Sequence, residues 1–281
     1  MVATEIMEKR TLMTTNLAIP QVRLANVISG AALDANEKGV NETFIGLIET
    51  DTEQHRAYIK VLDSRQLVNE LVCSTLGQAV GLPIPEGFIV RATSADLPES
   101  AMLANHKGEA LIFACADVGR PSLKRRLAQD GNEFAQQFLA NWKDGDATAI
   151  FDEWIANPDR HSGNLLIEGP SKVWLIDHGH SFTGPSWKAT DLVPDRAVKN
   201  QVADEIFPRL TLPGRMAVRT KAAALAKLFG IINPDAALSA CHAAHFMNLE
   251  DLAALRNFVT VRVDKIFDLV STRLGIPNMG V

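Results

Sequence analysis

Residues 154–167 read WIANPDRHSGNLLI, and residues 173–180 read VWLIDHGH. Apolar residues bracket three oxygen-bearing side chains in these segments: the carboxylates of Asp159 and Asp177 and the amide of Asn164. Transfer of a phosphoryl group needs a carboxylate that accepts the proton of the attacking hydroxyl. It also needs hard oxygen ligands for magnesium, which an amide and a second carboxylate can supply. The two segments therefore predict a site for magnesium-assisted phosphoryl transfer.

The order of residues within these segments resembles one family. Asp159 and Asn164 are five positions apart, which is the spacing in the protein-kinase catalytic loop. In ordinary protein kinases the His and Arg precede the Asp, whereas here Arg160 and His161 follow it. This order, together with Asp-His-Gly at 177–179, resembles the HipA-like kinases, which share it with the phosphoinositide kinases.

The resemblance implies a fold, an activity and a set of roles. The expected fold is α+β and bilobal, protein-kinase-like, with a small β-rich N-lobe and a mostly helical C-lobe. The expected activity is ATP- and Mg²⁺-dependent phosphotransfer to Ser or Thr of a protein substrate. Asp159 would be the catalytic base, Asn164 and Asp177 would hold the metal, and the supporting residues of the loop would be Asn157, Arg160 and His161. Arg160 would buttress the loop or offset phosphate charge, and His161 would hold the loop through a backbone carbonyl or Asp177.

Upstream, residues 57–60 read AYIK at the end of an expected strand. They look like the Val-Ala-Ile-Lys motif, in which the Lys holds the α- and β-phosphates of ATP. Lys60 would do this here, and Glu70 on the following helix would be its ion-pair partner. The interval of ten residues is short, so Glu53 or another acid is an alternative partner.

The first lobe, 1–118, is expected to hold strands and one αC-like helix. Strands are expected at 21–28, 42–48, 56–62, 86–91 and 110–116, with the helix at 66–80. The last strand leads into a hinge where the backbone of Ala116 and Val118 would bind adenine. No Gly-x-Gly-x-x-Gly motif is present, and the nearest phosphate-loop candidates are Ser29-Gly30 and the stretch to Gly39, with Gly30 as the contact.

The second lobe, 119–281, is expected to be helical around the catalytic loop. Helices are expected at 132–142, at 146–156 with Asp146 as N-cap, and as one long helix after Asn248 that ends before Gly275. A strand pair at 164–167 and 172–177 would form the metal-binding hairpin.

The composition and length narrow the expected partners and the expected compartment. The chain has 281 residues, 47% of them hydrophobic, and 28 Lys and Arg against 33 Asp and Glu, for a net charge of −5. No long basic block is present to bind nucleic acid or an anionic membrane, which also disfavours a lipid kinase. Three separated cysteines without a CxxC pair, and the lack of a signal-like N-terminus, favour a cytoplasmic protein. The length favours a compact family member that lacks the extra N-terminal subdomain of longer relatives; an antitoxin-type partner follows from the resemblance only.

Other interpretations compete. Asp159 with Arg160, taken alone, is the pattern of a surface ion pair. A pseudokinase would use the same fold for recognition without transfer. A metal-dependent hydrolase could assemble His161, Asp177, His178 and His180, although alternation on a strand would turn Asp177 away from His178 and His180.

Overall fold

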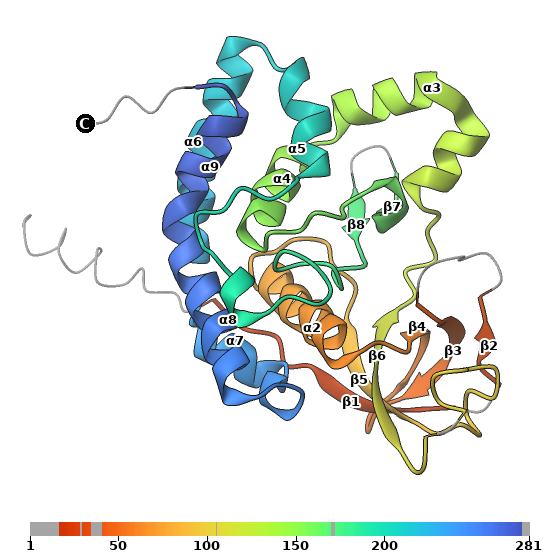
Figure 1. Ribbon diagram of the computed structural model, residues 1–281. Coiled ribbons are helices and arrows are strands. Elements are labelled where there is room, and N and C mark those ends of the chain that lie inside the picture. The colour runs from red at the N-terminus through yellow and green to blue at the C-terminus, as the bar shows by residue number, and fades with distance from the viewer. Residues whose placement is uncertain (1–16, 29, 35–40, 105, 170–171, 277–281) are drawn as a thin grey trace, which may run out of the picture.

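The computed structural model describes residues 17–28, 30–34, 41–104, 106–169 and 172–276. Strands dominate the first part of the chain and helices the rest, which confirms the predicted α+β division (Figure 1). The strands are β1 (Arg23–Val27), β2 (Ala32–Leu33), β3 (Thr43–Glu49), β4 (Gln54–Lys60), β5 (Gly87–Ala92), β6 (Ala110–Ala116), β7 (Leu165–Ile167) and β8 (Val173–Leu175). The helices are α2 (Ser64–Ala79), α3 (Leu123–Asn141), α4 (Gly145–Trp154), α5 (Gln201–Ile206), α6 (Leu212–Phe229), α7 (Pro234–Ala240), α8 (Leu249–Arg262) and α9 (Ile266–Arg273).

The first six strands form one sheet that closes on itself. Its order is β1-β5-β6-β4-β3-β2, and β1 also pairs with β3, so five strands make a small barrel with β2 appended. β1 is parallel to β5, whereas the other pairings are antiparallel. Side chains alternate across a strand, so every second residue points into the barrel. That interior is apolar and includes Phe44, Ile48, Ile59, Phe88 and Ile112.

Helix α2 lies between the barrel and the helical part. Its buried face belongs to the same hydrophobic core as α4, α6 and α9, and Ile89 and Phe113 join that core from the outer face of the barrel. Most of α2 is buried, including the polar residues Asn69 and Glu70. The β1 segment is also joined to the helical part, because the Val22 amide donates to the carbonyl of Ala240, 2.9 Å away. The division at 118 therefore marks where the six-stranded sheet ends, while the second core extends to both sides of it.

Some predicted elements have different bounds. α3 begins at Leu123 with Ser122 as its cap and is kinked at Gly131, which has φ of 77°, so the expected helix at 132–142 is its second half. Asp146 does not cap α4, which begins at Gly145; it lies in the first turn and binds Lys221. β8 ends at Leu175 rather than continuing to Asp177. The expected final helix is divided into α8 and α9 by a 3₁₀ turn at Val263–Lys265, and Asn248 caps it as predicted.

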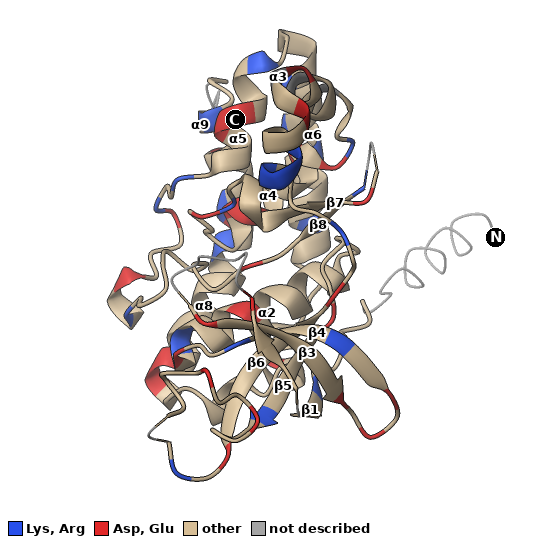
Figure 2. Cartoon of the chain, turned by 90° about the vertical axis from the view of Figure 1, so that its right-hand side faces the viewer, with Lys and Arg blue, Asp and Glu red and all other residues tan. Residues whose placement is uncertain are grey.

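Two further features are the distribution of charged residues along the chain and the character of the helices. Basic and acidic residues are interspersed along both parts of the chain in the view of Figure 2. No helix in the described ranges combines the length and the apolar character needed to cross a bilayer.

Candidate functional site

Lys60 joins three segments that are far apart in the sequence. Its Nζ donates to Glu70 Oε1 on α2 at 2.9 Å and to Asp177 Oδ1, after β8, at 3.0 Å. Lys60 and Glu70 are buried, while the Asp177 side chain is 44% exposed. The strand, the helix and the loop after β8 therefore meet at one ammonium group.

The short interval between Lys60 and Glu70 is accommodated by an early helix start. Asp63 caps α2 three residues after β4 ends, and its carboxylate accepts from the amide of Gln66 at 2.8 Å. Glu70 thus lies within the second turn of the helix, close to the end of the strand. The alternative partner, Glu53, instead binds Arg23 at 3.0 Å.

Electrostatic attraction outweighs burial in this ion pair. Burial alone would lower the pKa of Lys60, but Asp177 and Glu70 raise that pKa above its ordinary value. Burial would likewise raise the pKa of Glu70, but Lys60 and then His178 hold it well below its ordinary range. Both groups are therefore charged at neutral pH, as an ammonium that binds phosphate must be.

Asp177 adopts a left-handed backbone conformation with φ of 60°. Aspartate is one of the few residues that tolerates this region. The turn directs the Asp177 carboxylate toward Lys60 and the following amide, of His178, toward Glu70 Oε2 at 2.8 Å. Glu70 therefore holds both Lys60 and the backbone of the loop.

A network of hydrogen bonds holds the loop that carries Asp159. The Asp159 amide donates to Asn157 Oδ1 at 3.0 Å, and Asn164 Nδ2 donates to the Asp159 carbonyl at 2.8 Å. Asn157 is fully buried and also donates to Asp152 at 3.2 Å. Asn164 uses its amide nitrogen in this way, so its amide oxygen is the atom left to bind a metal.

Arg160 is a buttress of the loop. Its guanidinium is buried and binds Asp152 on α4, at 3.1 Å from Nη2 to Oδ1, and the carbonyl of Ile176 at 2.6 Å. It thus ties the loop to α4 and to the residue before Asp177. Because the side chain is enclosed, it does not contact a phosphate directly, and the structure favours the buttressing role. The reading of Asp159 with Arg160 as a surface ion pair is wrong for the same reason.

The histidines take three separate partners. His161 Nδ1 accepts from the Gly163 amide at 2.9 Å, so His161 caps the turn at 162–164. A bond from His161 to Asp177 or to a backbone carbonyl, the predicted partners, does not occur among the described residues. His178 is buried with Nδ1 3.6 Å from Glu70, whereas His180 Nδ1 lies 3.4 Å from Asp159 Oδ2. His178 and His180 follow the end of β8 and do not share a strand face, so the assumed alternation is wrong. No group of three or more His, Cys, Asp or Glu side chains that could hold a metal occurs among the described residues.

The side-chain oxygen atoms of Asn164 and Asp177 fit magnesium better than a softer metal. Asn164 offers an amide oxygen and Asp177 a half-exposed carboxylate, and magnesium prefers such hard ligands together with waters and phosphate oxygens. A site of this kind is completed by the phosphates of a nucleotide, so two protein ligands are sufficient.

Two backbone amides at the hinge are hydrogen-bonded to neighbouring segments. The Ala116 amide donates to the Glu86 carbonyl and the Asp117 amide to the Arg56 carbonyl, at 2.9 and 2.8 Å. Both amides are therefore bonded within the protein, and the adenine contacts of the Ala116 and Val118 backbone stay a prediction. Val118 makes no hydrogen bond among the described residues, so its backbone is available.

The predicted phosphate loop is only partly visible. Gly30 has φ of 101° and no neighbouring atom within 4 Å of the position of an added Cβ. Ser29 and residues 35–40 lie outside the described residues.

Two residues that hold the site were not predicted. Asp152 is the buried partner of Arg160, and Asn69 Nδ2 donates to the carbonyls of Gly179 and Ser181 at 2.7 and 3.0 Å. A signal was present for Asn69, since a polar residue sits among the apolar positions of an amphipathic helix.

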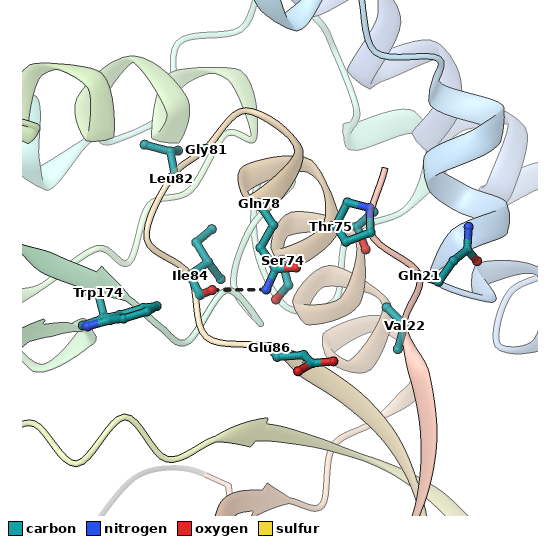
Figure 3. Close-up of a pocket in the computed structure, with 12 residues that line it drawn as sticks. Gln21, Val22, Ser74, Thr75, Gln78, Gly81, Leu82, Ile84, Glu86 and Trp174 are labelled. Atoms are coloured by element: carbon teal, nitrogen blue, oxygen red, sulfur yellow. Dashed lines mark hydrogen bonds between the residues drawn. The ribbon is translucent and has the colours of Figure 1, made fainter. Parts of the chain in front are cut away.

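A cavity of about 450 Å³ lies beside the second half of α2. Its walls include Ser74, Thr75 and Gln78 of α2 together with Trp174, and Gln78 donates its amide to the Ile84 carbonyl there (Figure 3). None of the predicted site residues lines this cavity.

Comparisons with known proteins bear on the family and on the fold. The profile described as HipA-like kinase matches residues 32–224, which include Lys60, Asp159, Asn164 and Asp177. The comparison with curated proteins finds no match. Among solved structures, the crystal structure of a Helicobacter pylori proinflammatory kinase, CtkA, is similar, with a TM-score of 0.55 and 13% identity over 91% of this chain and 99% of that chain. This likeness confirms the predicted bilobal, protein-kinase-like fold.

Proposed function

The chain belongs to the HipA-like kinase family, and from that premise we propose that it transfers the γ-phosphate of ATP to a serine or threonine hydroxyl of a protein. The observation that carries the proposal is the three-way contact of Lys60 with Glu70 and Asp177. It brings a charged ammonium, a carboxylate that would hold the metal and the helix that orients Lys60 to the same point. Asp159 and Asn164 lie in one loop that Arg160 fastens to the segment before Asp177.

Each residue then has one part in the reaction. Lys60 has three donors, of which Glu70 and Asp177 each accept one. The third is free for the α- and β-phosphates, and the donor on Asp177 joins it if that carboxylate turns to the metal when nucleotide enters. Asn164 and Asp177 would hold Mg²⁺, which would offset the negative charge of the phosphates. Asp159 accepts the proton of the acceptor hydroxyl as the hydroxyl oxygen bonds to the γ-phosphorus. The bond from that phosphorus to the β-γ bridging oxygen breaks, and ADP leaves with the electron pair.

His180 lies beside the carboxylate of Asp159 and orients it. Its ring lies 3.4 Å from Asp159 Oδ2, so the other carboxylate oxygen is left to face the acceptor hydroxyl. This arrangement orients the base without occupying both of its oxygens.

The test compares three variants with labelled ATP and magnesium. Asp159→Asn should lower phosphotransfer by about 10²–10⁴-fold, the usual contribution of a general base, and should retain the thermal shift caused by Mg·ATP. Asp177→Asn should lose the magnesium-dependent part of that shift. The matched control is Asp51→Asn, an exposed position in the turn between β3 and β4.

The outcomes separate the alternatives. Equal transfer by Asp159→Asn and Asp51→Asn would show that Asp159 is not the base. A wild-type protein that shifts with Mg·ATP but transfers no phosphate to itself or to protein substrates would be a pseudokinase. A shift with zinc alone would favour a hydrolase.

A further inference from the structure

Trp187 is held by two residues on the same face of α2. Arg65 and Asn69 lie about one helical turn apart, so their side chains are neighbours on the helix surface. The guanidinium of Arg65 covers the indole, with Cζ 4.2 Å from the ring centroid, and also forms an ion pair with Asp251 on α8. The indole Nε1 donates to Asn69 Oδ1 at 3.0 Å, and Trp187 is buried. Trp187 therefore joins α2 to the segment that follows the loop of Asp177.

The bond to Trp187 bears on which way the Asn69 amide points. An indole N–H is only a donor, whereas a backbone carbonyl is only an acceptor. The amide oxygen of Asn69 therefore faces Trp187, and its nitrogen faces the carbonyls of Gly179, Ser181 and Gly184, at 2.7, 3.0 and 3.4 Å. Removing the indole N–H leaves the buried amide oxygen without this donor. The side chain can escape that costly state only by turning away from the carbonyls.

The carbonyls that Asn69 holds flank a strained stretch of backbone. Phe182, Thr183 and Gly184 all have positive φ, of 57°, 79° and 149°. A β-branched residue such as threonine rarely adopts this region, and it does so only where several contacts hold it there. The amides of Phe182 and Thr183 donate to carbonyls just after α4, at 2.8 and 3.1 Å, while Asn69 binds the carbonyls of the same stretch. Loss of the Asn69 contacts would let this backbone relax.

The strained stretch is close in sequence to the Lys60 site. Asn69 and Glu70 are neighbours on α2, and Glu70 Oε2 accepts from the amide of His178, directly after Asp177, at 2.8 Å. The same turn of α2 thus holds the loop at both ends. A shift of the strained backbone therefore moves the Asp177 carboxylate relative to Lys60.

We propose that Trp187 is a positioning residue for nucleotide binding, because through Asn69 it keeps the loop of Asp177 in place beside Lys60. The proposal rests on the proposed function, which assigns ATP and its metal to these two residues. Arg65 supports Trp187 by covering its ring. The effect concerns nucleotide binding more than the chemical step, since the base Asp159 lies in a separate loop.

The test measures the dissociation constant of Mg·ATP by titration calorimetry on folded protein. Trp187→Phe keeps an aromatic ring under Arg65 but removes the N–H. It should raise the dissociation constant about 2- to 10-fold, the scale of one neutral hydrogen bond. In phosphotransfer, KM for ATP should rise by a similar factor while kcat changes less. The matched control is Trp154→Phe, which removes a buried indole N–H bonded to the Val259 carbonyl at 3.0 Å and should leave the dissociation constant unchanged.

A double variant separates positioning from a general loss of stability. If Trp187 acts through Asn69, then Asn69→Ala and the double variant Asn69→Ala with Trp187→Phe should have the same dissociation constant, because the second change removes nothing further. Effects that multiply would show that Trp187 acts independently of Asn69 and would overturn the proposal. Equal dissociation constants for Trp187→Phe and Trp154→Phe would overturn it too.

A milder pair of variants applies where Trp187→Phe does not fold. Arg65→Lys retains a cation for Asp251 but removes the planar group that covers the indole. It should raise the dissociation constant of Mg·ATP by a smaller factor. Arg219→Lys, at a guanidinium 4.7 Å from the ring centroid of Phe267, should not. Equal effects of the two lysine variants would contradict the proposal.

A second readout needs no nucleotide. Amide hydrogen exchange of the nucleotide-free protein should be faster at residues 178–184 in Trp187→Phe than in the wild type, and unchanged there in Trp154→Phe. Faster exchange in a protein whose wild type binds no Mg·ATP would show that Trp187 positions the loop, so that only the proposed function fails. Unchanged exchange in Trp187→Phe would overturn the role of Trp187, even where the chain phosphorylates a protein.

Discussion

The two hydrophobic cores of this protein differ in what they bury. The barrel interior is filled by aliphatic and aromatic side chains such as Phe44, Ile48 and Phe88. The core around α2 and α4 also encloses ion pairs, of which Arg160 with Asp152 and Arg262 with Glu153 are the most buried. Apolar packing specifies volume and shape, whereas a buried ion pair requires particular atoms at particular distances. The first core therefore supports the site, and the second determines where its residues lie.

The largest test of this contrast is Asp152→Ala. The change leaves the Arg160 guanidinium buried without its carboxylate, which costs about 3–5 kcal/mol of unfolding free energy. Urea denaturation measures the loss, and phosphotransfer should be lost as well because the loop is released from α4. The double variant Asp152→Ala with Arg160→Met should recover most of the stability. If Asp152→Ala lowers the free energy of unfolding by no more than an ordinary core truncation does, the ion pair does not make the proposed contribution to stability.

The second test removes the side chain that ties α2 to the loop after Asp177. Asn69→Ala leaves the carbonyls of Gly179 and Ser181 and the indole N–H of Trp187 without their partner. We expect a loss of about 1–3 kcal/mol, the cost of unsatisfied buried groups, in the same urea assay. Asn141→Ala, an exposed position on α3, is the matched control and should be close to neutral. Equal effects at the two positions would contradict a special role for Asn69.

The third test concerns pH. Burial, followed by the nearby Arg160 charge, lowers the pKa of His178 in the folded protein, so the unfolded chain binds this proton first as the pH falls. Stability should therefore fall below pH ~6.5, the ordinary value for histidine, by up to ~1.4 kcal/mol per pH unit. Measurements down to pH ~5 stay above the ordinary range of Glu70, whose own contribution is lost only in more acid solution.

The control for this slope is a residue that does not titrate. His178→Phe should flatten the pH dependence, because the new ring can pack near Phe151, which His178 already contacts edge-on at 6.5 Å. His106→Gln, at an exposed histidine, should leave the slope as it is. A slope that persists in His178→Phe would assign it to another group.

The smallest effect is expected inside the barrel. Ile48 is fully buried on β3, and Ile48→Val removes one methylene from an apolar interior. We expect a loss of about 0.5–1.5 kcal/mol and unchanged phosphotransfer per folded molecule. A strong effect on transfer at constant stability would show that the barrel does more than support the site.

The same contrast explains what the sequence could predict. The strands at 42–48 and 110–116 and the helix at 66–80 were predictable, because apolar periodicity is local. Lys60, Asp159, Asn164 and Asp177 could be proposed as site residues because their order and spacing resemble those of a known family. Asp152 and Asn69 were missed because their partners lie eight and more than a hundred positions away. The helical periodicity places Asn69 among apolar positions, but it does not identify the residues that Asn69 binds. The strand expected to reach Asp177 ended early because a left-handed residue cannot continue a strand, and aspartate does not mark that conformation in advance.

The bond between Val22 and Ala240 has a consequence for the order of synthesis. β1 leaves the ribosome before its parallel partner β5, and long before α7 supplies the carbonyl that receives the Val22 amide. During that interval the strand has unpaired backbone groups, which is the condition in which strands pair with the wrong partner. A chain released before residue 240 would lack this anchor, so rapid completion of translation, or a chaperone that covers the first strand, should raise the yield of folded protein.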